Sequence, residues 1–253
     1  METKAQISIQ INGTSYAAET GEFILAVARR ERVLIPTLCH HDGLPGQGCC
    51  RVCLVEVMER GRAKIVTACV YPVTDGLEVF TNTDRVEAVR RQNLALLRLR
   101  APEAERVRQL CMLYKVPLDG RFEAMAGERC ILCGLCARAC RSLGTGAIST
   151  VNRGVTKKIA PPYEEAPESC IGCGSCAISC PTGAIPMEQT PESRTIWGRV
   201  FSMRCCLQCG EPFATEEAAC HAARLTGQDA ETLCTRCRQG RIGATMRDVY
   251  GRL

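Results

Sequence analysis

Cysteine occurs twenty times in the 253 residues of this chain, and most of these cysteines stand in Cys-x2-Cys runs. Cysteine at this density forms either a disulfide framework or a set of metal ligands. Members of a Cys-x2-Cys run are too close in sequence to join distant segments through disulfides. The N-terminus, Met1-Glu2-Thr3-Lys4, also lacks the apolar region of a secretory signal peptide. The pattern therefore indicates metal ligation in a cytoplasmic protein.

The strongest pattern is an internal repeat with a spacing of 40 residues. Each half reads Cys-x2-Cys-x2-Cys-x3-Cys and ends in Thr-Gly-Ala-Ile. This is the spacing of bacterial two-cluster ferredoxins, in which the fourth cysteine of each run binds the cluster of the other run. The first predicted 4Fe–4S cluster is held by Cys130, Cys133, Cys136 and Cys180. The second is held by Cys170, Cys173, Cys176 and Cys140.

An upstream cysteine group has the spacing Cys-x10-Cys-x2-Cys-x15-Cys, which differs from the plant-type Cys-x4-Cys-x2-Cys run. Residues 48–56 read Gly-Cys-Cys-Arg-Val-Cys-Leu-Val-Glu. The segment resembles the N-terminal 2Fe–2S domain of the large iron–sulfur subunit of complex I-type NADH dehydrogenases. It is also similar to the diaphorase small subunit of NAD-reducing hydrogenases and NAD-linked formate dehydrogenases. The resemblance implies a 2Fe–2S cluster held by Cys39, Cys50, Cys53 and Cys69.

In that family's pattern, Gly-x-Cys-Arg-x-Cys-Leu-Val-Glu, Cys49 stands beside the ligand Cys50 and is not itself a ligand. The alternative is a register shifted by one residue. The resemblance covers residues 1 to about 185 but has a gap. The family usually places a 4Fe–4S site with one His and three Cys ligands between the two ferredoxin domains. Residues 90–120 contain only Cys111 and no histidine. We expect this cluster to be absent and Cys111 to be a buried thiol in a helix.

A third cysteine group lies near the C-terminus. It consists of two Cys-x2-Cys pairs separated by 24 residues, namely Cys206, Cys209, Cys234 and Cys237. This spacing is typical of a four-thiolate zinc ribbon, and a third 4Fe–4S cluster could use the same ligands. Cys205 and Cys220 are not needed as ligands in either case.

The remaining sequence predicts an α+β chain with four domains. The pattern of residues 6–81 predicts a β-grasp 2Fe–2S domain at 1–83. It consists of strands over 6–11 and 14–18 joined by Asn12-Gly13, a helix over 23–30, and strands over 54–58, 64–69 and 77–81. Two helices broken at Pro102, with their arginines on a solvated face, predict a helical linker at 84–122. A two-cluster ferredoxin domain at 123–198 and a four-cysteine module at 199–253 complete the chain.

The predicted function is a non-catalytic electron-relay subunit of a multi-subunit oxidoreductase. The chain has no Gly-rich dinucleotide fingerprint and no P-loop, so a flavin- and NAD(P)H-binding partner and a further redox or catalytic subunit are expected. A free-standing polyferredoxin shuttle is the alternative. The net charge of +5 without interleaved aromatic residues argues against nucleic-acid binding, and no apolar stretch reaches the roughly 18 residues of a membrane span.

Overall fold

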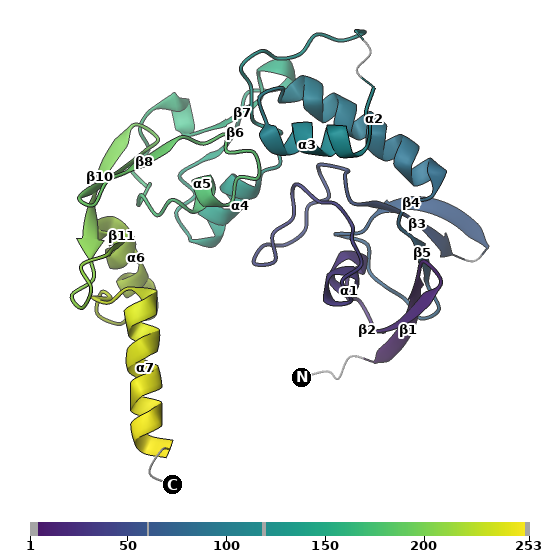
Figure 1. Cartoon of the computed structure of the whole chain (residues 1–253). Helices are drawn as coiled ribbons and strands as arrows, with labels where there is room; N and C mark the ends of the chain where they lie inside the picture. Colours follow the sequence, from purple (N-terminus) through teal and green to yellow (C-terminus); the bar gives the residue numbers. More distant parts are fainter. Residues whose placement is uncertain (1–4, 60, 118–119, 251–253) are drawn as a thin grey trace. The chain divides into compact units, whose positions relative to one another are not determined.

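The computed structural model describes residues 5–59, 61–117 and 120–250. The chain divides into two compact units. Unit 1 comprises Met1–Leu135 and Ser179–Ala184, and unit 2 comprises Cys136–Ile178 and Ile185–Leu253. The path of the chain through both units can be followed in Figure 1.

Unit 1 is built on a five-stranded sheet with the order β2-β1-β5-β3-β4. The strands are β1 (Gln6–Ile11), β2 (Thr14–Glu19), β3 (Leu54–Glu59), β4 (Arg62–Thr67) and β5 (Glu78–Phe80). β1 and β5 run parallel, and the other neighbouring strands pair antiparallel. Asn12 and Gly13 have φ of 52° and 82°, as a tight two-residue hairpin turn requires.

Helix α1 (Ile24–Arg30) packs on this sheet through apolar side chains at a helical spacing. Ile24 and Val27 are fully buried and share one core with Ile9, Val55 and Val79. The core explains why the alternating residues of β1 and β3 form strands, since each strand places one face in it. Every strand and helix predicted for residues 6–81 is present, although β4 begins and ends two residues before the predicted 64–69 strand.

Two further helices follow the sheet, α2 (Asp84–Arg100) and α3 (Glu105–Leu113). Thr83 caps α2 by accepting a hydrogen bond from the backbone N–H of Val86 (3.3 Å). The break between the helices lies at Pro102, as predicted from the sequence. A second core, which includes Leu94 of α2 and Val107 of α3, packs these helices against the cysteine loops of unit 1.

Unit 2 contains a four-stranded antiparallel sheet and a two-stranded one. The larger sheet has the order β11-β10-β9-β8, with β8 (Met187–Gln189), β9 (Ser193–Ile196), β10 (Arg199–Cys205) and β11 (Pro212–Thr215). The smaller sheet pairs β6 (Ser149–Val151) with β7 (Lys158–Ala160). β9 and β10 pair through a hairpin turn at Trp197 and Gly198, so this sheet extends across residues 198 and 199.

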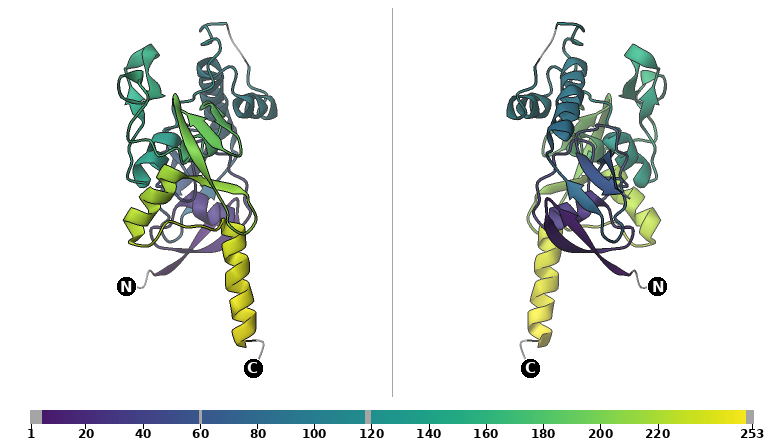
Figure 2. Two further views of the ribbon diagram at one scale, coloured as in Figure 1. Left: turned by 90° about the vertical axis from the view of Figure 1, so that its left-hand side faces the viewer. Right: turned by 90° about the vertical axis from the view of Figure 1, so that its right-hand side faces the viewer.

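The helices of unit 2 carry five of its eleven cysteines. They are α4 (Leu135–Ser142, whose first residue belongs to unit 1), α5 (Ser175–Ile178), α6 (Glu216–Thr226) and α7 (Thr235–Tyr250), with 3-10 turns at Gly154–Thr156 and Pro162–Glu164. Both views of Figure 2 show α7 extending away from the four-stranded sheet. None of the helices in the described ranges is long and apolar enough to cross a bilayer.

Candidate iron–sulfur and metal sites

The four upstream cysteines come together inside unit 1. Cys39, Cys50, Cys53 and Cys69 are 1%, 5%, 1% and 2% exposed. Cys53 precedes β3 and Cys69 follows β4, and these paired strands bring the two thiols together. The Cys53 thiol lies within hydrogen-bonding reach of Cys69, which raises the pKa of Cys53, and burial raises it further.

The remaining two thiols lie on the loop that follows α1. The backbone N–H of Cys50 donates to the sulfur of Cys39 (3.4 Å), as backbone amides do around cluster thiolates. Gly46 lets this loop approach Cys69, because a Cβ at Gly46 would lie 2.5 Å from the Cys69 carbonyl oxygen. Four buried sulfurs held by one loop and two strand ends fit the donor set of a 2Fe–2S cluster.

Cys49 and Cys50 differ in their surroundings. Cys50 is buried, whereas Cys49 is exposed and its thiol donates a hydrogen bond to the backbone carbonyl of Cys133 (3.3 Å). The Cys49 and Cys50 thiols both reach the Cys39 sulfur and hold its pKa below the ordinary value. The burial of Cys50 supports the unshifted register, in which Cys50 is the ligand.

Part of the first predicted 4Fe–4S site also lies in unit 1. The Cys130 loop is shaped by Glu128, whose carboxylate accepts the backbone N–H of Cys130 (2.8 Å). The backbone N–H of Leu132 then donates to the Cys130 sulfur (3.4 Å), and that of Ala184 donates to the Cys180 sulfur (3.3 Å). Cys133 is 6% exposed, and burial raises the pKa of its thiol to about 11. Cys136, the fourth predicted ligand, belongs to unit 2.

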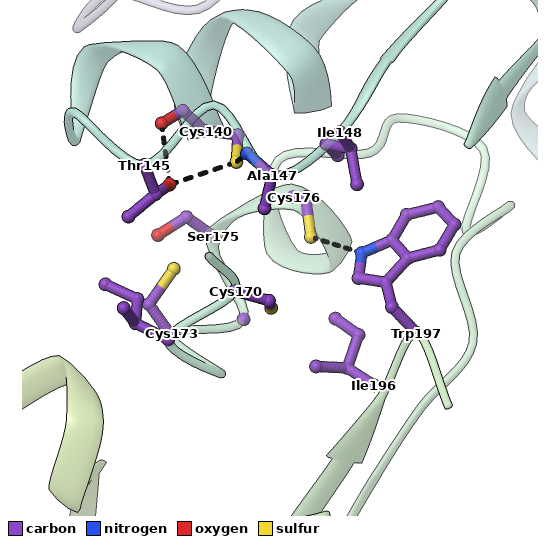
Figure 3. Close-up of a pocket in the computed structure, with 12 residues that line it drawn as sticks. Cys140, Thr145, Ala147, Ile148, Cys170, Cys173, Ser175, Cys176, Ile196 and Trp197 are labelled. Atoms are coloured by element: carbon purple, nitrogen blue, oxygen red, sulfur yellow. Dashed lines mark hydrogen bonds between the residues drawn. The ribbon is translucent and has the colours of Figure 1, made fainter. Parts of the chain in front are cut away.

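The second predicted 4Fe–4S site lies wholly in unit 2. Its four predicted ligands line one cavity, and these are Cys140, Cys170, Cys173 and Cys176. The same cavity is also lined by Thr145, Ala147, Ile148, Ile196 and Trp197. Figure 3 shows Cys140 on α4, Cys176 on α5, and Cys170 and Cys173 on the loop that precedes α5. Apart from the sulfurs, the lining is mainly apolar, which fits a cluster screened from water.

Two donors point at sulfurs in this cavity. The backbone N–H of Ala147 lies 3.2 Å from the Cys140 sulfur, and the indole N–H of Trp197 lies 3.4 Å from the Cys176 sulfur (Figure 3). Burial raises the pKa of Cys176 to about 11, and the hydrogen bond from Trp197 lowers it. Trp197 has φ of 54°, so the hairpin between β9 and β10 holds it in a conformation that is uncommon for a bulky residue. Sequence reasoning missed Trp197, because nothing near it in sequence indicates that it faces a cysteine.

Arg90 is the second residue that sequence reasoning missed. The prediction that the α2 arginines lie on a solvated face is wrong for Arg90, which is 1% exposed. Its guanidinium donates to the backbone carbonyls of Val52 (3.0 Å), Leu54 (2.6 Å) and Thr81 (3.0 Å), and burial lowers its pKa. Val52 and Leu54 flank Cys53, so Arg90 fixes the backbone on both sides of a predicted ligand and places a cation beside it.

The C-terminal cysteines form a compact group. The sulfurs of Cys206, Cys209, Cys234 and Cys237 all lie within 4.8 Å of one another. The first pair lies on the turn between β10 and β11, where Gly210, with φ of 73°, donates its N–H to the Cys206 carbonyl (2.8 Å). Cys205 and Cys220 are exposed. As predicted, Cys111 is buried in a helix, and its thiol donates to the Leu94 carbonyl (3.6 Å).

Comparisons with known proteins identify the domains that contain these cysteines. Residues 4–84 match the family described as "2Fe-2S iron-sulfur cluster binding domain", and residues 129–184 match "4Fe-4S dicluster domain". The chain is 29% identical to a subunit of the NADH-quinone oxidoreductase of Rhizobium meliloti, over 92% of this chain and 31% of that protein. It is 32% identical to the HndD subunit of the NADP-reducing hydrogenase of Solidesulfovibrio fructosivorans, over 72% of this chain and 36% of that protein.

Among solved structures, a chain of an NAD+-reducing [NiFe]-hydrogenase in the H2-reduced state matches with a TM-score of 0.54 and 26% identity. The match covers 62% of this chain and 75% of that chain. The chain thus spans about a third of the length of the curated relatives named above. It carries a 2Fe–2S domain, a 4Fe–4S dicluster domain and a four-cysteine group able to bind a metal or cluster. The chain is therefore an iron–sulfur protein homologous to subunits of NADH-quinone oxidoreductase and NADP-reducing hydrogenase.

Proposed function

We propose that the chain relays single electrons between a flavin- and NAD(P)H-binding partner and a further redox or catalytic subunit of a cytoplasmic oxidoreductase complex. The names of the relatives support this proposal, since they are subunits of enzymes that use NADH or NADP. The clusters would supply one-electron chemistry, while the chain positions them, excludes water and supplies hydrogen bonds that set their potentials. Substrate chemistry would belong to the partner subunits.

One contact in unit 1 carries the proposal. The Cys49 thiol lies next to the Cys39 sulfur on one side and donates to the Cys133 carbonyl on the other. A Cβ at Gly134 would also lie 3.1 Å from the side-chain oxygen of Gln47, so the two loops are in close contact at this second point too. A 2Fe–2S loop in direct contact with a 4Fe–4S loop is the arrangement that an intramolecular relay needs.

The ligand sets are part of the proposal. The 2Fe–2S cluster takes Cys39, Cys50, Cys53 and Cys69. The two 4Fe–4S clusters take Cys130, Cys133, Cys136 and Cys180, and Cys170, Cys173, Cys176 and Cys140. We also propose four domains, namely a β-grasp domain at 1–83, a helical linker at 84–122, a two-cluster domain at 123–198 and a C-terminal module at 199–253. The last two share one sheet, because the boundary between them falls in the β9–β10 hairpin.

The proposal is tested on the affinity-tagged full chain, purified anaerobically from its native host. We expect a flavoprotein to co-purify, and we expect NAD(P)H to reduce the clusters, followed by EPR spectroscopy, only when that flavoprotein is present. Dithionite serves as the control, because it should reduce the clusters in either case.

Two results would contradict this relay. Reduction of the isolated chain by NAD(P)H without a flavoprotein would place hydride chemistry in the chain itself. Elution from native extract as a monomer near 27.6 kDa would instead support a diffusing ferredoxin shuttle.

A further inference from the structure

The spacing of the C-terminal thiols distinguishes a single metal ion from a cluster. The sulfurs of Cys209 and Cys234 are 3.8 Å apart, and all four sulfurs of the group lie within 4.8 Å of one another. Four thiolates on one Zn²⁺, with Zn–S bonds of about 2.3 Å, lie about 3.8 Å apart at the corners of a tetrahedron. The sulfurs therefore already have nearly the spacing of a tetrahedral zinc site.

A 4Fe–4S cluster requires a wider arrangement. Each of its thiolates binds a different iron, and inorganic sulfide holds the irons apart, so the four thiolates lie farther from one another than around one ion. Within the described part of the chain, the four cysteines that line the cavity of Figure 3 do not form such a close group. The same chain thus has a wide cysteine set where the dicluster family matches and a narrow one at its C-terminal end.

The backbone around the narrow group has the form of two metal-binding turns. Gly210 and Glu211 close the first turn, since the Cys206 N–H donates to the Glu211 carbonyl (2.9 Å). The second pair lies at the start of α7, and the Leu207 N–H donates to the Thr232 carbonyl (3.0 Å), which joins the two turns. Four thiolates fill all positions of a tetrahedral ion, as in structural zinc sites, and leave no open position for a substrate.

The segment between the two turns contacts the second 4Fe–4S site. Residues 210–233 contain β11, which pairs with β10, and α6, whose Glu216 forms an ion pair with Arg204. Two further short hydrogen bonds join this segment to residues beside the predicted cluster ligands. The buried Thr215 hydroxyl donates to the carbonyl of Ile171 (2.6 Å), between Cys170 and Cys173. The His221 ring nitrogen lies 2.6 Å from the carbonyl of Leu143, just after α4. An ion at the cysteine group closes this segment into a loop and removes much of its freedom.

We propose that Cys206, Cys209, Cys234 and Cys237 bind one structural Zn²⁺, which holds β11 and α6 against the loop that carries Cys170 and Cys173. Zn²⁺ has no redox chemistry, so the module adds no fourth electron-transfer centre. Its role is to stabilise the loop of the neighbouring cluster.

The test measures metal content and zinc X-ray absorption on the anaerobically purified full chain. We expect one zinc per chain with four sulfur ligands at about 2.3 Å, together with about ten iron atoms from one two-iron and two four-iron clusters. The double variant Cys209→Ser/Cys237→Ser should lose the zinc and keep all the iron. Amide hydrogen exchange should then become faster over residues 212–226. The matched control is Cys205→Ser/Cys220→Ser, which removes two exposed cysteines of the same module and should keep the zinc.

A further variant separates loss of metal from failure of the module to fold. Cys209→His should retain zinc, because Cys3His is a common zinc ligand set. Two results would assign a 4Fe–4S cluster to the C-terminal cysteines instead and leave the relay proposal intact. One is a purified chain without zinc but with about fourteen iron atoms, and the other is a double variant that loses four iron atoms. Loss of zinc without faster exchange over residues 212–226 would refute the stabilising role.

Discussion

The hydrogen bond from Trp197 to Cys176 leads to a quantitative prediction about one cluster. Replacing Trp197 by Phe removes the indole N–H that lies 3.4 Å from the Cys176 sulfur and keeps an aromatic ring in the cavity. A donor to a ligand sulfur stabilises the reduced cluster more than the oxidised one, because reduction adds negative charge. The Trp197→Phe variant should therefore have a lower reduction potential at the cluster of Cys140, Cys170, Cys173 and Cys176.

The expected size of the shift follows from the strength of the bond. A hydrogen bond to a charged group contributes about 1.5–3 kcal/mol, and only the difference between the two oxidation states affects the potential. A difference of about 1 kcal/mol corresponds to about 40 mV for a one-electron couple. We expect a negative shift of about 20–60 mV on this scale.

The measurement is an anaerobic redox titration followed by EPR spectroscopy, with wild type and variant side by side. The 2Fe–2S cluster of the same molecules serves as the internal control, and its potential should be unchanged. An unchanged or more positive potential at the Cys176 cluster, with full iron content, would show that the indole N–H does not tune this site.

Three further predictions concern the cysteine loops. Arg90→Met leaves three buried carbonyls without their donor and should lower the free energy of unfolding, measured by urea denaturation, by about 3 kcal/mol or more. The control Arg85→Met, at an exposed position, should change this free energy little. Gly172→Ala places a Cβ 2.5 Å from a ring carbon of Phe201 in β10 and should reduce the iron content by up to four atoms per chain. Gly183→Ala should leave the iron content unchanged, because Gly183 has a similar φ but open space around the added Cβ. Cys49→Ser should leave the iron content unchanged, while Cys50→Ser should remove about two iron atoms; loss of iron from the Cys49→Ser variant but not from the Cys50→Ser variant would favour the shifted register.

Much of the fold follows from local sequence patterns. The Asn12-Gly13 pair lies between two alternating segments and forms the β1–β2 hairpin, because this dipeptide readily adopts the required positive φ values. Pro102 separates α2 from α3 at the predicted place, since proline cannot continue a helix. The repeated cysteine runs likewise predict the dicluster domain that the family comparison identifies, because their spacing shapes a loop within a few residues.

Other features depend on contacts between distant segments. Arg90 stands in a helix whose other arginines are exposed or half-buried, and only the packing of α2 on the ends of β3 and β5 buries it against three carbonyls. Trp197 meets Cys176 only because the β9–β10 hairpin folds back over α5. Neither contact has a sequence signature, since the partners come from separate elements and no local pattern specifies how those elements pack.

The C-terminal cysteines show most clearly which features follow from the sequence and which depend on tertiary packing. Two Cys-x2-Cys pairs separated by 24 residues specify a four-thiolate site by sequence alone, because each pair forms a local turn with both sulfurs on one side. The same spacing accommodates one zinc ion or a four-iron cluster. The distance between the two turns decides between them, and that distance is fixed only when β10, β11 and α7 pack together and bring the sulfurs within 4.8 Å.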